Sequence, residues 1–273
     1  MVATLTYCDV HAHLADPRIL PEADRILADS LAAGVTGILA NSARVGEWPA
    51  VVTLARQTPV YGALGLHPFF IDEWDPALPS QLEALLSTHS RLVAVGEIGL
   101  DFFHGRETRD RQIDIFGAQF ALARRLGLPV VLHNRKSWPE FFATVKALGG
   151  GPVRGTCHHF SASIEIARLA LDLGLYLSFC GPVTYPNARR LKAAAAFAPL
   201  DRILTETDTP DLPPAGHIGE HSYPWHVRDV VAELARLRGV ADTVIAAAVA
   251  ANFRQLLGLA GADQPAPAGQ TSQ

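Results

Sequence analysis

The chain has 273 residues, of which 49% are hydrophobic and 18% are charged. This length and balance are typical of one large globular domain, and α/β barrels commonly reach this size as a single domain. The formal net charge of −4 argues against a protein that holds nucleic acid on a broad basic face, although it leaves room for a small cationic phosphate site.

Short apolar runs alternate with longer helical patterns along the chain. The runs are rich in Val, Ile and Leu with little polar alternation, which is typical of strands buried on both faces of a parallel sheet. The predicted strands are Leu5–Val10, Gly37–Ala40, Val60–Leu64, Leu92–Gly96, Val130–Leu132, Val153–Cys157, Tyr176–Phe179 and Ile203–Thr205. The predicted helices between them are Ala23–Ala33, Trp48–Gln57, Ser80–Ser87, Arg109–Leu126, Trp138–Leu148, Ile164–Leu173, Asn187–Phe197 and Tyr223–Arg238.

Eight strand–helix units with right-handed crossovers favour a closed (β/α)8 TIM barrel over an open sheet. Gly34, Gly127 and Gly174 stand where a helix must stop and turn into the next strand. A doubly wound open sheet is the alternative, but it requires a Gly-rich phosphate loop after the first strand, where this chain has "DVHAHL". We therefore predict a single α/β domain with the barrel fold.

The barrel domain is expected to cover residues 1–261. An apolar run around Asp242 is too short to cross a membrane, and we expect it to form a helix that packs on the barrel. Residues 262–273 are rich in Pro, Gly, Ser and Gln, so a disordered tail is expected there.

Three cysteines, Cys8, Cys157 and Cys180, are far apart and odd in number. This pattern favours free thiols in a reducing compartment over disulfides or a zinc knuckle. The N-terminus lacks the basic and apolar parts of a signal peptide, and no apolar run is long enough for a membrane span. We expect a cytoplasmic protein with no membrane association, and we predict no protein partner.

Imidazoles and carboxylates gather after the predicted strands. They are His11, His13, His67, Glu97, Asp101, His133, Arg135, His158, His159, Glu206 and Asp208. In a (β/α)8 barrel the carboxyl ends of the strands share one rim, where active sites lie. A single histidine after a strand is usually structural, and a single carboxylate is often a helix cap. Five strands supplying such side chains to one rim instead favour a metal site.

The candidate ligand set also bears on the metal. Imidazoles with carboxylates suit zinc, manganese, iron or nickel, and they do not exclude magnesium. Six ligands, four imidazoles and two carboxylates, are too many for one tetrahedral ion, whereas two ions bridged by a carboxylate and a water use them naturally. Two ions about 3.5–4 Å apart can hold the attacking and departing oxygens of a hydrolytic displacement.

Together, "DVHAHL", "GLHPFF", "VGEIGLDFF", "LPVVLHNR", "CHHF", "YLSFCGPVTYPNARRL" and "LTETDTPDLPP" resemble the TatD-type hydrolases over roughly residues 8–258. These are metal-dependent deoxyribonucleases of the amidohydrolase superfamily. The resemblance implies that His11, His13 and Asp208 hold a first divalent ion, and that Glu97 bridges to a second. It implies that His133 and His158 hold this second ion, both ions being Mg, Mn or Zn. His159 falls where the family often has Cys, and we leave it out.

The resemblance also implies a mechanism. Metal ions lower the pKa of a bound water, and Asp208 is the catalytic carboxylate that takes its proton. His67 and Arg135 are expected to bind substrate and stabilise charge on the phosphoryl oxygens, with Asp101 orienting one of them. The substrate so implied is the end of a DNA or RNA strand, cleaved by a 3′-exonuclease.

One loop departs from the family pattern. Where the family usually has a basic sequence resembling H-R-G-K-x-N-x-P, this chain has "HIGEHSYP", His217–Pro224. Loss of basic residues weakens the case for a phosphate backbone as substrate. A hydrolase of a small-molecule ester, lactone or amide therefore stays open, as does a barrel that has lost turnover and acts as a binding partner.

Overall fold

The computed structural model describes residues 5–259, in which eight parallel strands lie in chain order around one sheet. The strands are β1 Tyr7–Ala12, β2 Val35–Asn41, β3 Val60–Leu64, β4 Leu92–Asp101, β5 Val130–Arg135, β6 Gly155–Cys157, β7 Tyr176–Phe179 and β8 Ile203–Thr205. The ends of the sheet meet where the Thr205 hydroxyl donates to the Cys8 carbonyl at 2.9 Å and the His13 N–H donates to the Thr209 carbonyl at 2.7 Å. The predicted single-domain (β/α)8 barrel is confirmed.

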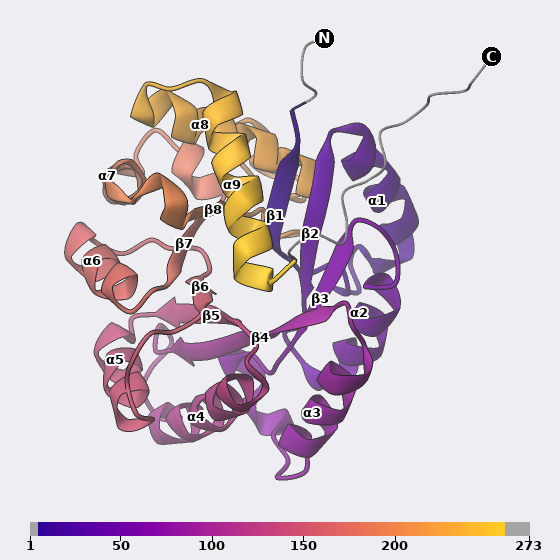
Figure 1. Cartoon of the computed structure of the whole chain (residues 1–273), viewed down its shortest axis with the longest axis vertical. Coiled ribbons are helices and arrows are strands. Elements are labelled where there is room, and N and C mark those ends of the chain that lie inside the picture. The colour runs from indigo at the N-terminus through magenta and orange to yellow at the C-terminus, as the bar shows by residue number, and fades with distance from the viewer. Residues whose placement is uncertain (1–4, 260–273) are drawn as a thin grey trace.

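Helices surround the strands, as Figure 1 shows. The α-helices are α1 Ala23–Ala32, α2 Trp48–Leu54, α3 Leu78–Thr88, α4 Arg109–Leu126, α5 Trp138–Ala147, α6 Ile164–Asp172, α7 Arg189–Phe197, α8 Val227–Arg238 and α9 Asp242–Leu257. Short 3₁₀ helices are η1 Leu20–Glu22, η2 Val45–Glu47, η3 Pro68–Glu73, η4 Gly181–Thr184, η5 Leu200–Arg202, η6 Ala215–His217 and η7 Pro224–His226. The predicted helix around Asp242 is α9, which packs against β1, β8 and α8.

The core lies between the strands and these helices. The apolar side chains of β2, β3 and β4 are buried, as expected for strands covered on both faces. Phe116 and Phe120 of α4 have ring centroids 5.6 Å apart, and Phe116 lies 5.9 Å from Phe141 of α5. Helix α4 ends at Gly127, whose φ of 65° is left-handed, as the sequence predicted.

The strands near the site differ in length from the prediction. β1 begins at Tyr7 rather than Leu5 and continues to Ala12, while β4 and β5 continue to Asp101 and Arg135. The backbone ladder runs on past the last apolar residue, because Asp101 still pairs with Arg135. Polar side chains at these positions point into the rim rather than ending the strand. His11, Glu97 and His133 therefore belong to strands, which fixes them more firmly than loops would.

Other boundaries differ by up to four residues. β6 begins at Gly155 rather than Val153, and α7 begins at Arg189 rather than Asn187. α8 begins at Val227, because Tyr223 has extended dihedral angles and the next residues form the separate turn η7. The domain limits at residues 1 and 261 and the tail at 262–273 lie outside the described residues and stay predictions.

Cys8, Cys157 and Cys180 are free and buried. Burial raises the pKa of Cys8 to about 12, so the thiol is protonated and unreactive at neutral pH. Within residues 5–259, no helix has both the length and the apolar character needed to cross a bilayer. The cytoplasmic location inferred from the sequence stays a prediction.

Glu233 of α8 forms ion pairs that link α7 to α8, and these pairs can be tested by mutation. Lys192 Nζ of α7 lies 2.9 Å from Glu233 Oε1, and Arg236 Nε lies 2.7 Å from Oε2. The hydrogen bond from Arg236 is the main cause that lowers the pKa of Glu233 to about 2, with Lys192 assisting.

Glu233→Gln is therefore expected to lower the free energy of unfolding by about 1 kcal/mol at pH 7. Because the folded pKa is depressed, this contribution is complete above the unfolded pKa of about 4.3 and fades as pH falls toward about 2. Urea unfolding of both proteins at pH 7 and pH 3 measures the difference. A gap that stays constant between these two pH values would contradict the ion pair.

Candidate metal centre

Glu97 of β4 lies at the centre of the polar side chains that gather at the carboxyl ends of the strands. Its Oε2 is 3.4 Å from the Nε2 atoms of both His11 and His13, and its Oε1 is 2.9 Å from His133 Nδ1. The carboxylate is 2% exposed. One buried carboxylate thus presents its two oxygens to two different groups of imidazoles.

Asp208 faces the first of these groups. Its Oδ1 lies 3.4 Å from His11 Nε2 and 3.5 Å from His13 Nε2. Asp208 has a left-handed φ of 55°, and its N–H donates to the His11 carbonyl at 2.9 Å. The contact between the segment after β8 and strand β1 therefore holds Asp208 in a conformation that non-glycine residues seldom adopt.

His158 lies between the two groups. Its Nε2 is 3.6 Å from Glu97 Oε1 and 3.8 Å from Asp208 Oδ1, and its ring stacks on His11 with centroids 3.7 Å apart. Its distances to the two carboxylates are nearly equal. His158 is therefore placed to contact either half of the cluster.

Three imidazoles have a polar partner on the side that faces away from the cluster. His13 Nδ1 lies 3.2 Å from the Asn41 carbonyl, and His133 Nε2 lies 2.8 Å from Asp101 Oδ2. His158 Nδ1 lies 3.0 Å from Glu206 Oε1. The Asn41 carbonyl and the Asp101 carboxylate accept the ring protons of His13 and His133 on that side, which orients the other nitrogen of each ring toward the cluster.

The electrostatics of the cluster follow from burial and mutual charge. Burial alone would raise the pKa of Glu97, but the surrounding imidazoles, led by His67, His158 and His11, hold it well below its usual range. Burial would likewise raise the pKa of Asp208, and His158, His13 and His11 depress it. Both carboxylates are therefore anionic at neutral pH.

His67 differs from the other imidazoles. Its Nδ1 accepts a hydrogen bond from the Phe69 N–H at 3.1 Å, so the proton of the neutral ring sits on Nε2. Burial lowers the pKa of His67 to about 3, which keeps the ring neutral. The Nε2–H lies 3.6 Å from Glu97 Oε1 and points into the site. His67 is therefore placed to donate a hydrogen bond into the site.

The donor atoms fit divalent ions. Three sets have ligand atoms within 4.8 Å of one another: His11, His158 and Asp208; His11, His13 and Glu97; and His67, Glu97 and His133. They combine imidazole nitrogens with carboxylate oxygens, which are donor groups that divalent metal ions take in proteins.

The comparisons with known proteins agree with this geometry. The family model described as TatD related DNase matches residues 8–258. The chain belongs to the TatD family of metal-dependent hydrolases. It is 33% identical to the metal-dependent hydrolase YabD of Bacillus subtilis, over 91% of this chain and 97% of that protein. It is 30% identical to the 3′-5′ ssDNA/RNA exonuclease TatD of Erwinia tasmaniensis, over 92% of this chain and 99% of that protein.

A solved structure shows the same architecture in this TatD-family chain and its relative. The crystal structure of YjjV, a TatD homologue from Escherichia coli, superposes with a TM-score of 0.87 at 32% sequence identity. The alignment covers 92% of this chain and 98% of that chain. The resemblance drawn from the motifs is thereby confirmed.

A cavity of about 490 Å³ opens over the TatD-family cluster. Its lining includes His13, His67, Glu97, His133, His158 and Asp208, together with the cationic side chains Arg18 and Arg135. Arg18 is already held by Asp16 and Asp211, with nitrogen–oxygen distances of 2.7 Å to each. Within residues 5–259, no carboxylate lies this close to Arg135, which therefore provides the cavity with an unpaired cation at short range.

The loop His217–Pro224 lies away from the cavity lining. Among residues 5–259, those that line the cavity include none from this loop. Ser222 is buried and its hydroxyl donates to the Thr207 carbonyl at 3.0 Å, while Ile218 is 69% exposed. The loop therefore lies outside the cavity, and its altered charges are separated from the candidate metal ligands.

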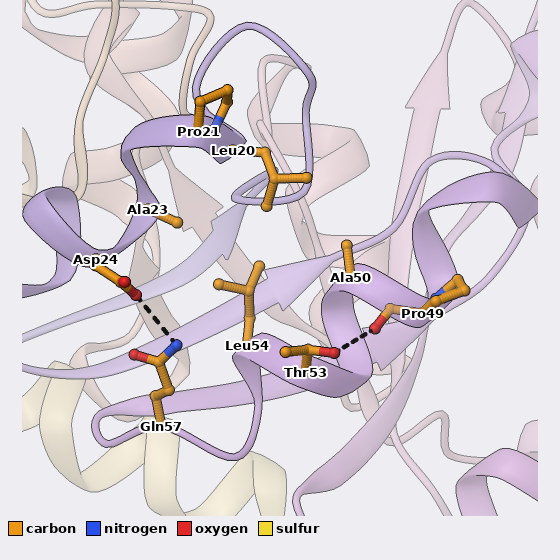
Figure 2. Close-up of a pocket in the computed structure, with 9 residues that line it drawn as sticks. All are labelled: Leu20, Pro21, Ala23, Asp24, Pro49, Ala50, Thr53, Leu54 and Gln57. Carbon is orange, nitrogen blue, oxygen red and sulfur yellow. Dashed lines mark hydrogen bonds between the residues drawn. The ribbon is translucent and has the colours of Figure 1, made fainter.

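A second hollow, of about 430 Å³, lies outside the barrel between α1 and α2 (Figure 2). Its polar side chains bond locally: the Gln57 amide donates to Asp24 at 3.4 Å and the Thr53 hydroxyl to the Pro49 carbonyl at 2.9 Å. Apolar side chains such as Leu20 and Leu54 form much of the remaining lining. This hollow gathers no set of catalytic groups.

The structure brings the predicted site residues together, with one change in contacts. Asp101 was expected to orient His67 or Arg135, but it instead accepts from His133 Nε2 at 2.8 Å. It also accepts from the Phe103 N–H at 2.8 Å. Asp101 therefore supports a proposed metal ligand rather than contacting substrate directly.

Glu206 was given no role from the sequence. It is fully buried, and its Oε1 lies 3.0 Å from His158 Nδ1 and accepts from the His159 N–H at 2.5 Å. Burial lowers the pKa of His158, but the carboxylates of Glu206, Asp208 and Glu97 together raise it to about 10. The feature of the sequence that could have indicated this role is a carboxylate two residues before Asp208, at the end of a buried strand.

Glu206→Gln is expected to weaken metal retention by about 10–100-fold, because an amide orients His158 without adding negative charge. Metal content after dialysis against buffers of fixed free metal concentration measures the effect. Glu233→Gln on α8 is the matched control and should retain metal as the wild type does. Equal retention by the Glu206 and Glu233 variants would show that Glu206 plays no part.

Proposed function

We propose that this chain is a metal-dependent phosphodiesterase that removes nucleotides from the 3′ end of single-stranded DNA or RNA. The support is threefold: the TatD related DNase family, the relative named a 3′-5′ ssDNA/RNA exonuclease, and a cationic side chain at the rim of the cluster. The formal charge of −4 agrees with a local contact to a strand end rather than binding along a long duplex.

In this proposal His11, His13 and Asp208 would hold one divalent ion, His133 and His158 would hold another, and Glu97 would contribute to both. Mg, Mn and Zn are the candidate ions. When bound, the ions would supply a water that is nucleophilic at neutral pH and positive charge beside the scissile phosphodiester.

The observation that carries the proposal is the environment of Glu97. Its two oxygens face separate groups of imidazoles, and outer partners hold the ring protons of His13 and His133 away from the cluster. This arrangement suits a carboxylate that would contact two ions.

Side chains around the cluster carry the remaining steps. Asp208 is anionic and accepts the proton of the attacking water. The water oxygen bonds to phosphorus as the P–O3′ bond breaks, and the leaving oxygen takes a proton from solvent to become the 3′ hydroxyl of the shortened strand. The His67 Nε2–H and the Arg135 guanidinium stabilise negative charge on the phosphoryl oxygens. Asp101 keeps the proton of His133 on Nε2 and so orients that ring.

A second candidate function is hydrolysis of a small-molecule ester, lactone or amide. The observation that favours it is the outer loop, where Ile218 and Glu220 are exposed and Glu220 pairs with His217 at 3.1 Å. A negative charge at this edge opposes a long phosphate backbone. The loop does not alter the cluster itself.

A substrate panel separates the two candidates. Metal-replete protein is incubated with Mg²⁺, Mn²⁺ or Zn²⁺ and with single-stranded DNA, single-stranded RNA, p-nitrophenyl esters and lactones. The proposal predicts release of mononucleotides from the 3′ end and little ester or lactone hydrolysis. Efficient ester or lactone hydrolysis without nucleotide release would favour the second function.

A further inference from the structure

A row of aromatic rings leads out of the cavity along one wall. From His133 in the cluster, the ring of Phe69 follows at a centroid distance of 6.2 Å and that of His104 at a further 6.1 Å. Phe103 lies 4.9 Å beyond His104. Phe69 and Phe103 are 54% and 43% exposed, although large aromatic side chains are usually buried.

Cations border the outer part of this row. Arg135 Cζ lies 3.5 Å from the centroid of the Phe103 ring, and Lys136 Nζ lies 4.6 Å from the same centroid. Both side chains are exposed. Two positive charges thus lie against the ring of Phe103, next to His104 in the row.

Phe69 is the ring of this row that borders both the cluster and solvent. It lines the cavity, and its backbone N–H is fixed by His67 Nδ1. Its ring makes a T-shaped contact with His67, with centroids 4.7 Å apart, and its side chain is 54% exposed. An exposed ring that lines the cavity beside the cluster suits a flat ligand.

We propose that Phe69 stacks against a nucleobase near the 3′ end of a single strand, while Arg135 and Lys136 neutralise the adjoining phosphates. The inference rests on the proposed nuclease function and adds how the strand is held. Stacking on aromatic rings beside cations is the usual physical basis of binding to single strands without sequence preference. A duplex end hides its base faces, so this wall favours unpaired strands.

The test compares two single-stranded oligonucleotides that differ only in their bases. One is normal, and the other has abasic residues at its three 3′-terminal positions, with the phosphodiester backbone unchanged. The wild type is expected to cleave the normal strand with a kcat/KM about tenfold higher, because stacking is lost in the abasic strand. Phe69→Ala is expected to lose this preference by slowing on the normal strand alone. Phe69→Trp is expected to keep it.

Phe197→Ala is the matched control. Phe197 is also an exposed phenylalanine with an arginine near its ring, Arg168 Cζ at 5.2 Å, but it ends α7 just before β8 begins, at the opposite end of the barrel from the cavity. This variant should keep the wild-type preference. Thermal unfolding of all variants checks that each is folded.

The outcomes are distinct. Equal slowing of Phe69→Ala on both oligonucleotides, or an unchanged preference in that variant, would overturn the stacking role while leaving the nuclease function in place. A wild type that cuts both strands equally well would also overturn it. A wild type that cleaves neither strand would contradict the nuclease function, and the stacking role with it.

Discussion

Replacement of Asp208 by Asn is expected to reduce kcat by about 10²–10⁴-fold while leaving most of the bound metal in place. The amide still offers an oxygen to an ion, but it cannot accept the proton of the attacking water. The wild-type carboxylate is suited to that role because neighbouring imidazoles keep its pKa low against the effect of burial. Steady-state nucleotide release and metal content, measured on the same preparation, test both parts.

Asp172→Asn provides the control for this change. Asp172 is an exposed carboxylate at the end of α6, away from the cavity lining, and its variant should keep wild-type kcat. An Asp208→Asn protein with near-wild-type turnover would refute the proton-accepting role. A protein that loses its metal as well as its turnover would instead make Asp208 chiefly a ligand.

Replacement of Glu97 by Gln is expected to have the largest effect on metal binding. The amide nitrogen would face imidazole lone pairs that lie within 3.4 Å of the present carboxylate oxygens, and the central negative charge would be lost. Loss of an outer partner of a ligand usually costs about 10–100-fold in metal affinity, so loss of a bridging ligand should exceed that. We expect the variant to lose at least one ion per chain and almost all nucleotide release.

The measurement for Glu97 is metal content after equilibrium dialysis, together with activity at saturating metal. Glu233→Gln, a carboxylate-to-amide change outside the cluster, should bind and turn over normally apart from its lower stability. If Glu97→Gln retained as much metal as the wild type, Glu97 would not be the bridging ligand.

The barrel and the rim of candidate ligands could be predicted because both depend on local patterns. Buried parallel strands are continuous apolar runs, and the residues that follow them share one end of a barrel. His11, His133 and Asp208 were found in this way. The exact strand ends could not be predicted. The pairing of β4 with β5 continues to Asp101 and Arg135, through polar side chains that serve the site.

The partners of the imidazoles could not be predicted because they depend on strand register. Asp101 reaches His133 through the pairing of β4 with β5, in which Gly99 pairs with His133. A Cβ at Gly99, where φ is 150°, would lie 1.9 Å from the His133 carbonyl oxygen, so only glycine allows this close approach. Sequence spacing carries no information on which side chains meet across such a pair.

The roles of Glu206 and of the loop His217–Pro224 also could not be predicted from the sequence. A carboxylate next to a predicted ligand could have been a helix cap, and only its burial against His158 indicates a role at the cluster. The loop drew attention because its charges differ from the family pattern, yet it lies outside the cavity lining. Distance from the reacting atoms decides how much a substitution matters.

The most direct test of the account is to strip the protein of metal with a chelator and then titrate Mg²⁺, Mn²⁺ or Zn²⁺ back. Metal content and the release of mononucleotides from single-stranded DNA are followed together. The account predicts that the stripped protein is inactive and that release returns as ions bind, reaching its maximum at two per chain. Nucleotide release that persists in the stripped protein, or that returns with none of the three metals, would contradict it.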